Sequence, residues 1–253
     1  MYGHRARIGY CSPPFVTEVF AYEFYRIVPD GVTLMITTLE VGNEYTARSF
    51  SDSQERSLAA ARAMAQAGAD VVILGGNPVN QSLGMEHLPR ICDELAVEIG
   101  VPVVASALAQ REALRMLGAR KVATVHMAGP DHDERANRQM RALGFDSVGA
   151  LSPVAHGLLA YGRIAEKEAI TLAREARARW PEADCIHFAN AHWPTAFAID
   201  PVEQELGVSV MASGQAVIWK ALRTVGVREP IEGFGRLWNQ AQSHAAIRER
   251  SNN

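Results

Sequence analysis

The chain has 253 residues, a hydrophobic fraction of 48%, a charged fraction of 21% and a formal net charge of -3 at pH 7. These values are typical of an ordinary globular protein with one large or two small domains, and the weakly negative charge gives no basic surface for a nucleic-acid backbone. No apolar run reaches the roughly 20 residues that cross a bilayer, and the N-terminus lacks a signal-peptide pattern, so we expect a cytoplasmic protein with no membrane partner.

The first half of the chain alternates predicted strands and helices. Strands are predicted over 7–11, 32–39, 71–74 and 101–105, and helices over 15–27, 51–66 and 87–99. Ser12-Pro13-Pro14 is expected to break the first strand, because two prolines remove two backbone donors. We expect a loop over 40–50.

The second half repeats this alternation. Strands are predicted over 121–125, 147–152 and 185–189, and helices over 133–143 and 165–179. Alternation at this spacing is typical of a parallel sheet with helices on both faces. The three cysteines, Cys11, Cys92 and Cys185, have no CxxC spacing, which argues against a disulfide framework or a zinc site. No metal is expected.

The two halves are related by a nearly constant offset. Asp184 minus Asp70 is 114, Ser213 minus Ser106 is 107, and the glycines 226 and 118 differ by 108. A period near one hundred is that of a whole lobe. We therefore predict an α/β fold of two pseudo-symmetric lobes, each a short parallel sheet flanked by helices. Residues 1–106 with 214–253 form the first lobe and 107–213 the second.

Ligands of open parallel sheets bind outside the carboxyl ends of the strands, where loop amides and helix N-termini converge. This rule selects residues 12–15, 75–80, 126–130 and 190–195 as the lining of one cleft between the lobes. Within it, Asn77 and Asn190 end two corresponding strands. They are expected to face each other across the site.

Several of these segments together resemble the aspartate/glutamate racemase superfamily, and within it the arylmalonate decarboxylase and maleate isomerase branch. The resemblance is carried by Pro13-Pro14, by the run 71–76, by the run 206–213, by Trp219 and by the run 233–237. It implies two pseudo-symmetric lobes with the site between them, and chemistry that uses no metal or organic cofactor.

Most of that superfamily moves a proton on an α-carbon with two cysteines, one from each lobe, and the decarboxylase branch keeps only the second. The resemblance places the first cysteine position at Gly76 or Asn77 and the second at Asn190, so neither position holds a thiol here. An amide cannot exchange a proton near neutral pH, but it can donate and accept hydrogen bonds. The two asparagines, with the backbone amides of 76–78 and 191–192, are expected to hold a carboxylate or a developing oxyanion.

His192 lies two residues after Asn190, and histidine is the side chain best suited to proton exchange at neutral pH. We therefore predict Asn77, Asn190 and His192 as catalytic residues. His187 is expected to be a satisfied core residue, and Cys11 a small buried hydrophobe.

Further residues are predicted to contact the substrate from the same turns. They are Ser12, Pro13, Pro14, Gly75, Gly76, Pro78, Asn80, His126, Ala191, Trp193 and Thr195. The resemblance adds Tyr45, Phe50, Leu158 and Tyr161, at positions where the decarboxylase branch has an apolar substrate pocket.

These residues predict a cofactor-independent enzyme that acts on a small carboxylate or carbonyl compound through an enolate-like intermediate, as a decarboxylase or an isomerase. Two alternatives stay open. One is hydrolysis of a small amide, lactam or ester, with His192 activating water. The other is a binding protein for a small acid that has lost catalysis. Assembly into a homo-oligomer is possible in each case.

Overall fold

The computed structural model describes residues 2–14, 16–41, 47–153 and 157–239, without the side chains at positions 40, 41, 47, 49 and 50. Among these residues, no helix is both long and apolar enough to cross a membrane.

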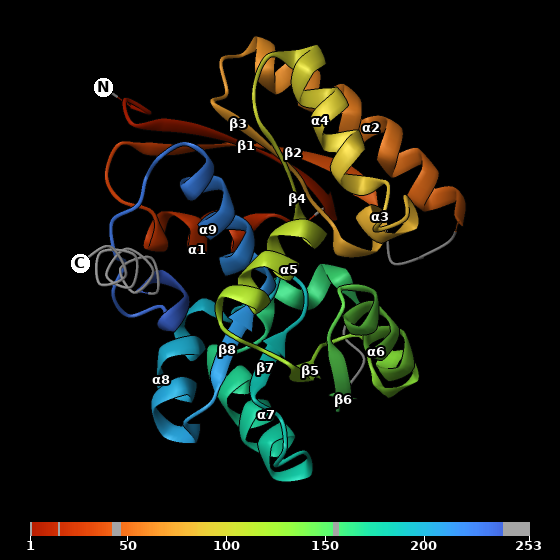
Figure 1. The fold of residues 1–253 in the computed structure, drawn as a ribbon, viewed down its shortest axis with the longest axis vertical. Helices are drawn as coiled ribbons and strands as arrows, with labels where there is room; N and C mark the ends of the chain where they lie inside the picture. The colour runs from red at the N-terminus through yellow and green to blue at the C-terminus, as the bar shows by residue number, and fades with distance from the viewer. Residues whose placement is uncertain (1, 15, 42–46, 154–156, 240–253) are drawn as a thin grey trace, which may run out of the picture.

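Two four-stranded parallel sheets form the centre of the molecule (Figure 1). The first contains β1 (Ala6–Pro14), β2 (Val32–Val41), β3 (Val71–Leu74) and β4 (Val103–Ala105), and the second contains β5 (Lys121–Val125), β6 (Asp146–Leu151), β7 (Cys185–Phe188) and β8 (Ser209–Ala212). Their strand orders, β2-β1-β3-β4 and β6-β5-β7-β8, are the same order one lobe apart. The predicted α/β fold of two similar halves is confirmed.

Helices cover both faces of each sheet (Figure 1). They are α1 (Glu18–Ile27), α2 (Ala47–Gln66), α3 (Asn77–Ser82), α4 (Leu88–Ile99), α5 (Ser106–Met116), α6 (Asp133–Ala142), α7 (Glu166–Arg179), α8 (Ala196–Leu206) and α9 (Ser213–Thr224). Three short 3-10 helices, η1 (Pro130–His132), η2 (Leu158–Arg163) and η3 (Arg236–Trp238), complete the elements. In the first lobe α2 packs beside α4, and in the second α7 packs beside α8.

Two helices join the lobes. The α5 helix follows the last strand of the first sheet and α9 follows the last strand of the second, and the two pack against each other. The α9 helix also packs on β3 and β4, so the chain returns to the first sheet near its C-terminal end (Figure 1). The predicted lobe bounds, 1–106 with 214–253 and 107–213, stay a prediction.

The first strand differs from the prediction. It continues through Pro13 and Pro14, and the expectation that Ser12-Pro13-Pro14 ends it was wrong. Ser12 pairs with Thr38 and Pro14 with Val41, with an irregularity between them. The fixed φ of proline is compatible with extended backbone, and prolines are tolerated where a strand ends or bulges.

Three helices also differ from the prediction. The α2 helix begins at Ala47, so Phe50 lies in a helix and not in the expected loop. The α3 helix replaces a predicted turn, and Pro78 lies in its first turn, where a missing N–H costs no helical hydrogen bond. The α8 helix was not predicted and contains Pro201.

Candidate active site

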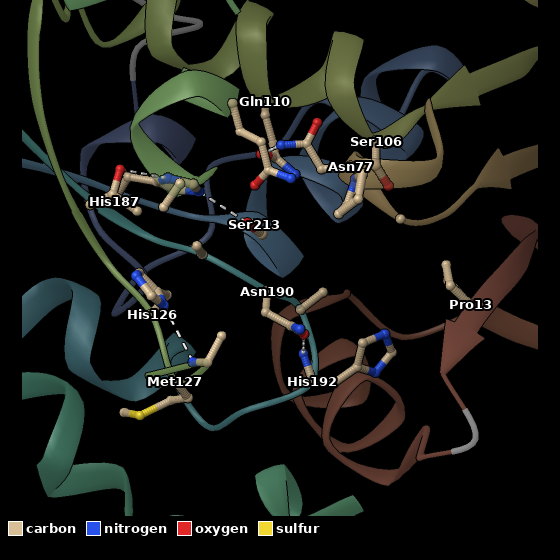
Figure 2. A pocket seen from close by; sticks show the side chains of 18 of the residues that line it. Pro13, Asn77, Ser106, Gln110, His126, Met127, His187, Asn190, His192 and Ser213 are labelled. Carbon is tan, nitrogen blue, oxygen red and sulfur yellow. Dashed lines mark hydrogen bonds between the residues drawn. The ribbon is translucent and has the colours of Figure 1, made fainter. Parts of the chain in front are cut away.

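A cavity of about 120 Å³ lies where the carboxyl ends of the two sheets meet (Figure 2). Eleven of the residues predicted as site residues line it: Pro13, Pro14, Gly76, Asn77, Pro78, His126, Leu158, Tyr161, Asn190, Ala191 and His192. Asn77 and Asn190, from different lobes, face the same space. Each of the four turns that the cleft rule selected contributes residues to the lining of this cavity.

Five predicted residues do not line this cavity. They are Ser12, Gly75, Asn80, Trp193 and Thr195. Asn80 is buried, and its Oδ1 accepts the backbone N–H of Ala107 at the start of α5 at 3.1 Å. The Trp193 Nε1–H donates to the Ala189 carbonyl at 2.7 Å. These side chains support the turns around the cavity.

Gly75 and Thr195 also have structural roles outside the cavity lining. A Cβ atom at Gly75 would clash with the backbone oxygen of Cys11, so only glycine fits between β1 and β3 there. The Thr195 N–H donates to Glu23 at 2.7 Å. Tyr45 lies outside the described residues, and so does the side chain of Phe50.

Gly76 and Asn190 occupy equivalent positions in the two lobes. Asn190 minus Gly76 is 114, the offset that also relates the two aspartates before the strands. Their φ angles are +83° and +80°, and Asn190 is the only non-glycine residue with a positive φ in the part of the chain that the structure describes. The structural counterpart of Asn190 is therefore Gly76. Asn77 lies one residue further on.

The side chain of Asn190 closes its own turn. Its Oδ1 accepts the backbone N–H of His192 at 2.8 Å, which leaves the NH₂ end of the amide as its hydrogen-bond donor. The N–H of His192 is thereby engaged, and Pro78 has none. These two residues cannot supply the backbone amides that we expected to hold an anion.

Asn77 begins α3 and reaches toward α5. Its Nδ2 donates to the Gln110 Oε1 at 3.3 Å, and its Oδ1 has no hydrogen-bond partner among the described residues. Figure 2 shows Asn77 and Gln110 on the cavity wall opposite His126.

His192 is almost completely buried and lies against the first lobe. Its Nε2 is 3.4 Å from the Ser12 Oγ and 3.5 Å from the Tyr10 Oη, and its Nδ1 has no partner in the described part of the chain. Burial lowers the pKa of His192 to about 3. Its imidazole is therefore neutral at physiological pH, and one ring nitrogen can still bond to a bound molecule.

His126 ends β5 and has both ring nitrogens engaged. Its Nδ1 accepts the Ala128 N–H at 3.3 Å, so the Nε2–H donates to the Asp133 carboxylate at 2.8 Å. Burial, and to a smaller extent the positive charge of Arg135, lower the pKa of His126 to about 4. His126 is therefore a neutral residue of the cavity wall, and its hydrogen bond to Asp133 holds the ring in place.

His187 is buried and hydrogen-bonded, as expected, but it also lines the cavity, which the sequence did not indicate. Its Nε2 is 3.1 Å from the Ser213 Oγ, and its Nδ1 is 3.5 Å from the Thr124 Oγ1. Both hydroxyl-bearing residues line the cavity too. For Ser213 the sequence did contain a signal, because the two copies of the repeated segment end in Ser106 and Ser213.

The lining contains one arginine, Arg135, and no Asp or Glu among the described residues. The same residues include no group of three or more histidine, cysteine or carboxylate side chains that could hold a metal ion. All three cysteines are buried outside the lining, and burial raises the pKa of Cys11 to about 12 and of Cys92 to about 11. The cavity therefore favours an anionic molecule and holds no thiol.

Comparison with known proteins identifies the fold and the family. The model of the arylmalonate decarboxylase family matches residues 8–238. Arylmalonate decarboxylase of Bordetella bronchiseptica is 27% identical over 235 residues, which are 92% of this chain and 97% of that protein.

Solved structures agree with this match. A glycine-to-cysteine, cysteine-to-serine double mutant of arylmalonate decarboxylase in its liganded form has a TM-score of 0.81 and 26% identity, over 92% of this chain and 98% of that chain. A variant of the maleate isomerase Iso from Pseudomonas putida S16 with maleate has a TM-score of 0.80 at 20% identity, over 93% and 98%, and this likeness concerns the fold alone. The chain is a member of the arylmalonate decarboxylase family.

Proposed function

We propose that this protein is a cofactor-independent enzyme that removes a carboxyl group from a small malonate-type carboxylate, or isomerises a small carboxylate, through an enolate-like intermediate. The observation that carries the proposal is one cavity, lined by Gly76 and Asn190 from equivalent strand ends, in a chain of this family. The absence of Asp and Glu from its described lining suits a substrate that carries its own carboxylates. We retain the cytoplasm as the expected location.

The developing anion needs preorganised hydrogen-bond donors. The NH₂ group of Asn190, the first backbone N–H groups of α3 beside Asn77, and one ring nitrogen of His192 can supply them. Such donors contribute several kcal/mol when they are held in place and water is excluded. His192 would then act as a neutral hydrogen-bonding group, because its low pKa makes it a weak base.

The two alternatives are not favoured. The related proteins are a decarboxylase and isomerases, which supports neither hydrolysis nor a binding protein without catalysis. Hydrolysis also requires a base that activates water, and burial holds the pKa of His192 far below neutrality. Malonates and maleate are therefore the first compounds to test.

The test is release of carbon dioxide from phenylmalonate, and isomerisation of maleate, by metal-free protein in the presence of a chelator. Solvent deuterium should appear at the α-carbon of the decarboxylated product. Asn190→Ala should lower kcat/KM by about 100-fold, the usual scale for loss of one oxyanion donor. Its circular dichroism spectrum should stay unchanged.

Two results would reject the proposal. One is a folded wild-type protein that neither decarboxylates a malonate, isomerises maleate, nor exchanges an α-proton of the corresponding monocarboxylate. The other is turnover in which oxygen-18 from water enters the product carboxylate, since that label indicates hydrolysis.

A further inference from the structure

Three polar side chains that contact one another lie in the part of the cavity wall formed by the second lobe. Ser213 is the first residue of α9, His187 lies in β7 and Thr124 lies in β5. The His187 Nε2 is 3.1 Å from the Ser213 Oγ, and its Nδ1 is 3.5 Å from the Thr124 Oγ1. All three line the cavity and are buried, and Figure 2 shows the bond between His187 and Ser213.

The first lobe supplies an internal comparison. Ser106 begins α5 as Ser213 begins α9, and both line the cavity. In the register of the central strands, Ile73 pairs with Tyr10 where His187 pairs with Thr124, and 187 minus 73 is again 114. A serine therefore begins both helices, whereas a histidine lies beside only one of them. A buried imidazole costs desolvation that an isoleucine avoids, so His187 indicates a role beyond packing.

The position of Ser213 suits proton delivery to a bound intermediate. A Cβ atom at the following residue, Gly214, would lie 3.6 Å from the Cβ of Ala191. The start of α9 therefore lies against the turn that contains Asn190 and Ala191, where the resemblance places the second cysteine position. The two contacts of His192 to hydroxyl groups, at 3.4 and 3.5 Å, are longer than the 3.1 Å contact between His187 and Ser213. They also lie on the side of the first lobe.

We propose that Ser213 and His187 form the proton relay that protonates the carbanion, in place of the missing thiol. The proposal rests on the decarboxylation proposed above. Loss of carbon dioxide breaks a C–C bond of the malonate dianion and leaves its electron pair on the α-carbon. The Ser213 Oγ–H gives its proton to that carbon, and the protonated His187 Nε2–H gives its proton to Oγ. A dianion and one proton thus become a monoanion and carbon dioxide, with serine and imidazole both neutral.

The negative charge of the bound substrate favours protonation of His187. In the free protein, burial and the neighbouring His126 hold the pKa of His187 well below 6.5, at about 3. His132 and Arg135 also line the cavity from η1 and α6, and none of the described lining residues is a carboxylate. Two carboxylates lie outside the lining: Asp133, which accepts the Nε2–H of His126, and Glu23, whose Oε2 would lie 3.8 Å from a Cβ atom at Gly214. A bound dianion adds negative charge inside the cavity, and this charge favours the imidazolium. Both hydroxyl oxygens can accept a hydrogen bond from the charged ring, so the geometry fits it.

The experiment uses 2-methyl-2-phenylmalonate, whose two carboxylates are enantiotopic and whose decarboxylation product is chiral. Wild-type protein should give one enantiomer in excess. Ser213→Ala and His187→Gln should lower kcat by about 100-fold or more, the range for loss of a positioned acid, and should give a product close to racemic. Because the relay needs the His187 imidazolium, the kcat of the wild type should fall at high pH, and His187→Gln should remove this fall. Ser213→Cys should restore the enantiomeric excess.

Thr224→Ala is the control, because it removes a hydroxyl group from the opposite end of α9, outside the cavity lining, where the Thr224 Oγ1–H donates to the Lys220 carbonyl at 2.9 Å. It should keep the kcat, the enantiomeric excess and the pH profile of the wild type. A folded Ser213→Ala protein with wild-type kcat and enantiomeric excess would overturn the relay while the decarboxylase proposal stands. A wild-type protein that releases no carbon dioxide from any malonate would overturn both.

Discussion

The residues at the two strand ends show how one backbone shape accommodates different side chains. Gly76 and Asn190 both adopt a positive φ, which glycine reaches without cost and asparagine more readily than other residues. Asn190 also satisfies the His192 N–H through its own Oδ1. The asparagine therefore stabilises the turn at the position where the resemblance places a cysteine, and the Asn190 amide still faces the cavity.

Substitution of the two asparagines of α3 should affect activity and stability differently. Asn77→Ala should leave the free energy of unfolding nearly unchanged and lower kcat/KM by about tenfold or more, because Asn77 lines the cavity. Asn80→Ala should cost about 1–2 kcal/mol of stability, since the Ala107 N–H loses its acceptor. Urea unfolding and kinetics per folded molecule measure the two effects. The contrary result would be a large activity loss in Asn80→Ala with full activity in Asn77→Ala.

At the scale of elements, the repeated Ala-Asp pair before β3 and β7 has a structural role. Asp70 accepts the N–H of Arg7 at 2.7 Å, and Asp184 accepts the N–H groups of Arg120 and Lys121 at 3.0 and 3.1 Å. In each lobe an aspartate thus holds the start of the neighbouring central strand. This contact maintains the register that brings the opposite strand ends to the cavity.

A second tie joins elements of different lobes. Glu23 on α1 is buried, and its Oε1 accepts the N–H groups of Thr195 and Ala196, at the start of α8, at 2.7 and 2.8 Å. The first backbone N–H groups of a helix have no partner within the helix, so this carboxylate caps α8. Burial raises the pKa of Glu23 from 4.5 to about 7, in opposition to these hydrogen bonds.

This pKa predicts how stability depends on pH. The neutral carboxyl group is favoured in the folded protein, so the contribution of Glu23 is complete below pH 4.5 and is lost as the pH rises toward 7. Relative to Glu23→Gln, the wild type should lose up to roughly 3 kcal/mol across that range. Urea unfolding at pH 4.5, 6 and 8 measures the difference. A difference that does not change with pH would show that Glu23 titrates at its ordinary pKa.

At the scale of the whole molecule, the two lobes share a core. The larger apolar cluster contains residues of the first sheet with α5 and α9, and it includes Val122, Cys185 and Met211 from the second sheet. The smaller cluster lies between the other face of the second sheet and the helices α7 and α8. Because the first cluster crosses between lobes, neither sheet can lose its packing alone.

We therefore expect the chain to unfold in one cooperative transition. Leu114→Ala in α5 and Leu172→Ala in α7 remove buried leucines from the two clusters, and each should cost about 2–5 kcal/mol. Both variants should shift the same single midpoint, measured by tryptophan fluorescence and by far-ultraviolet circular dichroism in urea. Two separate transitions, with Leu172→Ala moving only one of them, would show independent lobes.

The sequence by itself determined the duplicated α/β fold and the strand ends that line the cavity. Alternating apolar strands and helices, the repeated Ala-Asp pair and the near-constant offset are local patterns, and parallel topology brings their carboxyl ends together. Helix starts were missed at Ala47 and in α3 and α8, and Thr195 precedes α8 without a capping hydrogen bond from its side chain. The turns that line the cavity were therefore predicted better than the bounds of these helices.

Only the tertiary structure decided which polar side chains face the cavity and which support it. Asn77 and Asn80 lie in the same turn of α3, yet Asn77 lines the cavity, whereas the Asn80 Oδ1 accepts the Ala107 N–H at the start of α5, which packs against α3. Likewise His187 lies within a strand that the sequence marks only as buried. Its contact with Ser213, 26 positions later, forms because β7 and β8 are neighbours in the sheet and α9 begins where β8 ends.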